Sequence, residues 1–103
     1  MYQYTVRINL DKCMEANWLT YMLEKHIRDV MDTGYFLKAS LKKIINETES
    51  SSVEYSVEYL AASLSAIEEY REKCSPALQK DVLDKFGNKF TAEREVLIII
   101  KSF

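Results

Sequence analysis

The heptapeptide VEYSVEY, residues 53–59, decides the fold class of this chain. Its odd-numbered positions hold Val or Tyr, and its even-numbered positions hold Glu or Ser. An apolar–polar alternation with a period of two is typical of a β-strand that buries one face and exposes the other. We therefore predict a strand over residues 53–60, with its tyrosines in the core.

The segment before this strand predicts a hairpin. Residues 46–52 read NETESSS, a polar stretch of turn-forming residues. Residues 36–45 alternate as well, with lysines and a serine between apolar residues. We expect residues 36–45 and 53–60 to pair as antiparallel strands joined by the polar loop.

The segment before residue 36 predicts a helix that is preceded by another strand. Helical spacing covers residues 14–32, and Gly34 is well placed to end that helix in a left-handed conformation. Residues 2–10 alternate strictly between apolar and polar side chains, which predicts another strand.

Towards the C-terminus two helices and a last strand are predicted. Ser65 and Glu68 have capping-box spacing, although Ser63 is a rival N-cap. Ser75 followed by Pro76 has the order of an N-cap and a first helical residue, so a new helix begins there, and Gly87 ends it. The predicted elements after the hairpin are helices 64–74 and 76–86 and a strand 89–101.

The order strand, helix, strand, strand, helix (broken in two), strand is the split βαβ, or ferredoxin-like, pattern. It predicts one α+β domain over residues 1–103, in which helices cover one face of a four-stranded antiparallel sheet.

The composition excludes several classes of protein. With 103 residues, 48% hydrophobic and 29% charged, the chain is expected to be globular. A net charge of −2 argues against nucleic-acid binding, and no apolar run is long enough to cross a membrane. The N-terminus lacks a signal-peptide pattern, so a cytoplasmic location is expected. Cys13 and Cys74 lack a metal-ligand pattern, and in that compartment both are expected to be reduced and at least half-buried.

The sheet face turned away from the helices is predicted to be polar, with mixed charges. The residues expected on this face are Thr5, Arg7, Asn9, Lys38, Ser40, Lys42, Glu54, Ser56 and Glu58. No aromatic side chain is expected on this face, which argues against RNA binding. The last strand, however, ends in VLIII, which is apolar on both faces. This pattern favours a homodimer that packs the polar sheet faces together or shares the C-terminal strands.

Several motifs resemble a bacterial family of uncharacterised proteins known as domain of unknown function 4286. They are W18…M22…H26-I27, V30-M31-x-T33-G34-x-F36, Y55-S56-V57-E58-Y59, P76-A77-L78 and F86-G87…F90…R94. The resemblance implies a ferredoxin-like fold similar to the dimeric α/β-barrel superfamily, which includes small monooxygenases. It supplies no reaction, because the family has no assigned activity.

One candidate pocket emerges from the first helix. Trp18, Met22 and His26 stand at i, i+4 and i+8. An apolar arc of Leu19, Leu23, Ile27 and Val30 is expected to face the sheet, with His26 within it and with Trp18 and Met22 at its edge. In one interpretation His26 is a neutral core residue bonded to a tyrosine hydroxyl or a backbone carbonyl. In the other, the helix stands off the sheet and leaves a small-molecule pocket lined by Trp18, Met22, His26, Tyr55 and Tyr59.

Two functions follow from the pocket hypothesis. We expect a homodimeric binding or regulatory module whose ligand is a small apolar or aromatic molecule. The alternative is a cofactor-free, monooxygenase-like enzyme with His26 as its acid–base group. No metal site is expected from a single histidine and two distant cysteines, and two glycines cannot form a phosphate-binding loop, so no cofactor is expected.

Overall fold

A computed structural model describes residues 1–46 and 50–103. It confirms the ferredoxin-like α+β fold. Residues 47–49 of the predicted 46–52 loop lie outside the described residues. The strands are β1 (Tyr2–Asp11), β2 (Lys38–Ile44), β3 (Ser52–Ala61) and β4 (Phe90–Ile98), and the helices are α1 (Glu15–Tyr21), α2 (Ile27–Asp32), α3 (Leu64–Lys73) and α4 (Ser75–Phe86).

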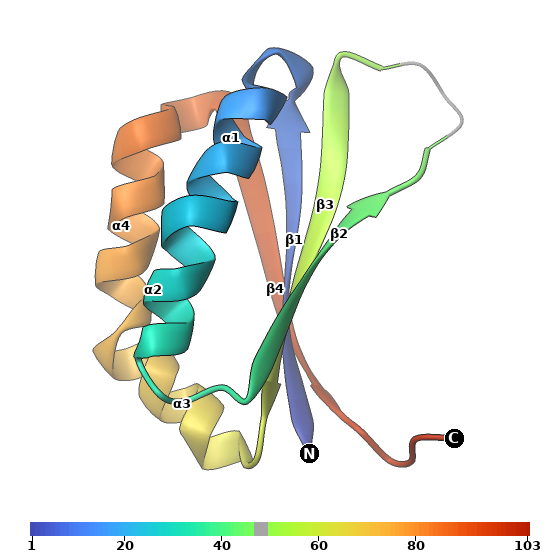
Figure 1. Ribbon diagram of the computed structural model, residues 1–103, viewed down its shortest axis with the longest axis vertical. Coiled ribbons are helices and arrows are strands. Elements are labelled where there is room, and N and C mark those ends of the chain that lie inside the picture. The colour runs from blue at the N-terminus through green and yellow to red at the C-terminus, as the bar shows by residue number, and fades with distance from the viewer. Residues whose placement is uncertain (47–49) are drawn as a thin grey trace.

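The four strands form one antiparallel sheet in the order β2-β3-β1-β4. All four helices lie on one face of this sheet, and the opposite face is uncovered (Figure 1). Tyr4, Ile8, Tyr55, Val57 and Tyr59 belong to the core between the layers, as the alternation predicts. The buried hydrophobic residues that the strands contribute all come from the two central strands, β1 and β3.

The helix predicted over residues 14–32 contains a π-helical turn. α1 and α2 are joined without a break by the turn Met22–His26. The wider hydrogen-bonded loop of this turn holds one extra residue. The side chains after it are therefore rotated about the helix axis, relative to their positions in a regular α-helix. Trp18, Met22 and Val30 are therefore all buried, whereas Leu23, expected on the buried arc, is exposed. The other residues of the expected arc face the core, since Val30 is buried and Leu19 and Ile27 pack against it, so the expectation was wrong only for Leu23.

The ends of the helices follow the glycine and serine signals. Gly34 has φ +83° just after α2, and Gly87 has φ +58° at the end of α4, both in the left-handed region that favours glycine. The capping box at Ser65 was wrong, since Ser63 is the N-cap of α3 and its Oγ accepts a 3.2 Å hydrogen bond from the amide of Ala66. Pro76 is the second rather than the first residue of α4.

The last strand is shorter than predicted. β4 ends at Ile98, which pairs with Tyr2, the first residue of β1. One more backbone hydrogen bond follows, from the Ile99 amide to the Met1 carbonyl oxygen at 3.0 Å. The following residues leave the sheet on the side away from the helices (Figure 1). Ile100 and Phe103 of this tail are exposed.

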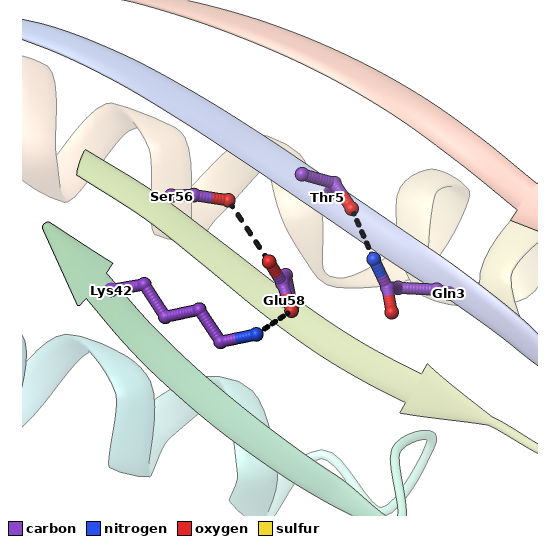
Figure 2. Close-up of polar contacts among 5 residues, drawn as sticks. All are labelled: Gln3, Thr5, Lys42, Ser56 and Glu58. Atoms are coloured by element: carbon purple, nitrogen blue, oxygen red, sulfur yellow. Dashed lines mark hydrogen bonds and ion pairs between the residues drawn. The ribbon is translucent and has the colours of Figure 1, made fainter. Parts of the chain in front are cut away.

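The uncovered sheet face is polar, and its side chains contact one another along and across the strands. Figure 2 shows Lys42 Nζ 2.8 Å from a carboxylate oxygen of Glu58, with Ser56 3.4 Å from the same side chain. Gln3 donates a 3.0 Å hydrogen bond to Thr5. Beneath these longer side chains Thr5 and Ser56 are buried. The face is therefore polar and hydrogen-bonded over its centre.

Two further properties concern the chain as a whole. Among the described residues no helix combines the length and the apolar character needed to cross a membrane. Cys13 and Cys74 are both free, and Cys13 is exposed rather than half-buried as expected, because it lies in a short 3-10 helix (Lys12–Met14) outside the core.

Candidate functional site

A cavity of about 50 Å³ lies between the helices and the sheet. Three strands contribute its floor, and the first helix, α3 and α4 contribute its walls. The lining residues from the strands are Tyr4, Val6, Ile8, Val57, Tyr59, Phe90, Ala92 and Arg94. The lining residues from the helices are Trp18, Met22, His26, Tyr70, Ser75, Leu78, Gln79 and Val82. The cavity is larger than the ~10–15 Å³ that one water molecule needs.

The structure places four of the five expected pocket residues on this cavity. Trp18, Met22 and His26 reach it from the first helix, and Tyr59 reaches it from β3. The π-helical turn includes Met22 and His26, so it sets how these two side chains enter the cavity. Such turns are frequent at functional sites.

Tyr55 lies beside the cavity but does not line it. Its ring packs against the Trp18 indole at a centroid distance of 4.8 Å. Its hydroxyl donates a 2.6 Å hydrogen bond to Glu15, which also pairs with Lys43 at 2.7 Å. The Lys43 ammonium and the Tyr55 hydroxyl lower the pKa of Glu15, so its carboxylate stays charged and anchors the start of α1 to the β2–β3 hairpin. Tyr55 therefore supports Trp18 from behind.

Two residues that line the cavity each carry a buried polar atom with no hydrogen-bond partner among the described residues. These atoms are Nε1 of Trp18 and Nδ1 of His26. The tyrosine partner that one interpretation expected for His26 is not present; its ring instead stacks on Tyr21, with centroids 6.1 Å apart. An unsatisfied buried polar group costs about 1–3 kcal/mol, and in native structures such groups usually find a protein, water or ligand partner.

Burial sets the protonation of the groups that line the cavity. It lowers the pKa of His26, so the imidazole is neutral at pH 7 and can accept or donate one hydrogen bond. Burial raises the pKa of Tyr70 to about 12 and raises the pKa of Tyr59 as well, so both hydroxyls keep their protons. Apart from Arg94, the lining is therefore uncharged and contains several hydrogen-bond donors.

Sequence reasoning missed the mouth of the cavity. Gln79 and Arg94 are the exposed members of the described lining, so the cavity opens between α4 and β4. Arg94 pairs with Val6 across the sheet and so faces the helices. The alternation of Phe90, Ala92, Arg94 and Val96 along β4 is the sequence signal that could have shown that Arg94 faces the helices. Gln79 carries no such signal, and its amide donates a 2.7 Å hydrogen bond to Ser75 at the start of α4.

The described residues contain no group of three histidine, cysteine or carboxylate side chains placed to hold a metal ion. His26 has no hydrogen-bonded carboxylate among them, because nearby Asp29 is paired with Lys25 at 2.6 Å. The described residues therefore form a cavity with one neutral imidazole that has no carboxylate bonded to it.

Comparison with known proteins yields one family and many related folds. The family model described as "Domain of unknown function (DUF4286)" matches residues 1–100. No curated protein matches the chain.

Solved structures with the same fold cover nearly all of the chain. A dimeric ferredoxin-like protein from an uncultured marine organism is 10% identical, with a TM-score of 0.72, over 99% of this chain and 97% of its own. MhuD with two manganese protoporphyrin IX bound per active site is 14% identical, with a TM-score of 0.72, over 100% of this chain and 98% of its own. SnoaB, a cofactor-independent oxygenase from Streptomyces nogalater, is 10% identical, with a TM-score of 0.68, over 98% of this chain and 95% of its own. At these identities the likeness is one of fold.

Proposed function

Since the chain belongs to the family described as a domain of unknown function (DUF4286), we propose its function from the geometry of the cavity: it binds a small molecule between the first helix and the sheet. The observation that carries this proposal is the pair of unpartnered buried atoms, Trp18 Nε1 and His26 Nδ1. Both residues line the same cavity. A ligand with a polar atom within reach of each would form the hydrogen bonds that these two atoms lack within the protein.

The size of the cavity limits what it admits. At about 50 Å³ it is well below the ~300 Å³ at which sites for drug-sized molecules begin. A ligand of that larger size requires the exposed side chains of Gln79 and Arg94 to swing outward. Mostly apolar and aromatic walls with a few polar groups are the usual composition of a small-ligand site.

The chain provides its own reporter for a binding test. Trp18 is the only tryptophan, so its indole N–H gives a single resolved signal in a ¹⁵N NMR spectrum. We expect members of a small aromatic fragment library to shift this signal in the wild type. Ala92→Leu fills the cavity from β4 and should abolish the shift, whereas Ala77→Leu, at an exposed position of α4, should preserve it.

Two further measurements keep this test decisive. Overpacking costs about 1–3 kcal/mol, so circular dichroism must show that Ala92→Leu is folded, and the milder Val6→Ile should weaken binding in the same direction. Fragments that bind Ala92→Leu and the wild type with equal affinity would show that binding occurs elsewhere.

Catalysis is the second candidate, and it too depends on His26. A neutral imidazole in a cavity is competent as a general base, and the fold is shared with a cofactor-independent oxygenase. Binding is favoured because no carboxylate among the described residues orients the ring. Binding alone predicts that no bound fragment causes oxygen uptake by the wild type, whereas an oxygenase predicts uptake that His26→Gln removes without loss of binding.

The assembly is proposed to be a homodimer that packs the uncovered sheet faces together. Solved structures of the same fold include proteins described as dimeric. In this chain Thr5 and Ser56 are buried at the centre of the face, and the apolar tail after β4 projects on the same side. A second copy would cover both features.

A further inference from the structure

We propose that Arg94 makes the cavity selective for a ligand that carries one negative charge, with a carboxylate as the group that the guanidinium binds. This inference rests on the proposed function and specifies the class of ligand. It starts from the charges of the lining: among the described residues that line the cavity, Arg94 is the only one with a formal charge at pH 7, since His26 is neutral.

The position of Arg94 in the sheet directs its side chain to the cavity. Val57, Val6 and Arg94 form one row across β3, β1 and β4, and all three line the cavity. Glu93 and Glu95, the neighbours of Arg94 along β4, belong to the opposite face because side chains alternate along a strand. Neither glutamate can therefore neutralise Arg94 from within its own strand.

The guanidinium has no partner in the part of the chain that the structure describes. Seven ion pairs are formed there, and none includes Arg94. Its charge nevertheless reaches into the cavity, where it disfavours protonation of His26 and favours ionisation of Tyr70. A cation at the mouth of an uncharged, donor-rich cavity attracts an anion and repels a cation.

The chemistry of the donors selects a carboxylate among small anions. A guanidinium presents parallel N–H groups that match the two oxygens of a carboxylate. Deeper in the cavity the Trp18 indole N–H is a donor without an acceptor. We therefore expect a ligand with its carboxylate at the mouth, an apolar or aromatic body against Val6 and Tyr59, and an oxygen within reach of Trp18.

The test compares acids with neutral amides of the same shape. Benzoate is compared with benzamide, and propionate with propionamide, so that the apolar part of the probe has two sizes. The Trp18 indole signal reports binding to the folded full chain. We expect the wild type to bind the acid of at least one pair tenfold or more tightly than its amide, and to lose part of this preference as salt is raised. Arg94→Gln should remove the preference, and Arg94→Lys should restore part of it.

Arg28→Gln is the matched control, because it removes the same charge from an exposed position of α2. It should leave the preference unchanged. Equal affinity of the wild type for an acid and its amide would overturn the selectivity and leave the pocket proposal standing. No shift of the Trp18 signal with any of the four probes would contradict both, and equal loss of acid and amide binding in Arg94→Gln would show that Arg94 only maintains the structure.

Discussion

At position 26 one imidazole is held neutral by the residues packed around it. Burial is the main cause of its lowered pKa; Asp29 and Asp81 oppose the shift, and Lys25 and Arg94 add to it. The unfolded chain therefore takes up a proton near pH 6.5, whereas the folded chain resists until a lower pH. Stability from this group is present above pH 6.5 and is lost as the pH falls towards the folded-state pKa.

His26→Gln should remove this pH dependence. Between the two pKa values the free energy of unfolding of the wild type should fall by up to about 1.4 kcal/mol per pH unit, and that of the variant should lack this component. Urea denaturation at several pH values between 7 and 5 measures both. His26 is the only histidine, so parallel curves would mean that its imidazole is not desolvated.

The hydroxyl of Tyr55 makes a second prediction at this scale. Its 2.6 Å hydrogen bond to the Glu15 carboxylate attaches the first helix to β3, and bonds to charged groups contribute about 1.5–3 kcal/mol. Tyr55→Phe should lower the free energy of unfolding by about 1.5 kcal/mol, since Lys43 still holds Glu15. Tyr2→Phe, where the structure gives the hydroxyl no hydrogen bond, should change it by less than about 0.5 kcal/mol. Equal effects of the two variants would contradict the anchoring role.

At the scale of elements, the start of α3 distinguishes two serines. Ser63 Oγ accepts the hydrogen bond from Ala66, whereas Ser65 lies inside the helix. Ser63→Ala should therefore cost about 1 kcal/mol in chemical denaturation, and Ser65→Ala should cost about half of that or less. A larger loss in Ser65→Ala would mean that the helix begins two residues later in solution.

The elements were predictable wherever local chemistry alone decides them. Alternation located β1 and β3 to within one residue, and Gly34 and Gly87 ended their helices. The end of β4 was not predictable, because it depends on where the partner strand begins. The exposure of Leu23 was not predictable either, since the π-helical turn leaves no mark in the periodicity.

The candidate site shows the same division between local and long-range information. Helical spacing brought Trp18, Met22 and His26 to one cavity, as expected. Tyr55 was placed on the correct sheet face, yet its ring lies behind Trp18, and only the packing of the helix against the hairpin determines that. Ser75 and Gln79 could not be predicted, because α4 brings them to the cavity from far along the chain.

At the scale of the whole molecule, the proposed dimer gives a direct prediction. Light scattering should give about 24 kDa, twice the 12.0 kDa of one chain. Ser56→Arg places a bulky charge at the centre of the uncovered face and should shift the mass to that of the monomer, whereas Ala77→Arg on α4 should not. A wild type that remains at 12.0 kDa at micromolar concentration would contradict the dimer.

The inward direction of Arg94 has a consequence for the behaviour of the chain in a crowded solution. β4 is an edge strand, and an edge strand can add strands from other molecules unless a charge or a bulge prevents it. An arginine turned towards the helices resists such pairing, because the added strand would have to cover its charge. A neutral residue at this position would therefore cost the protein its resistance to aggregation even in the absence of any ligand. Lysine should be the best tolerated replacement.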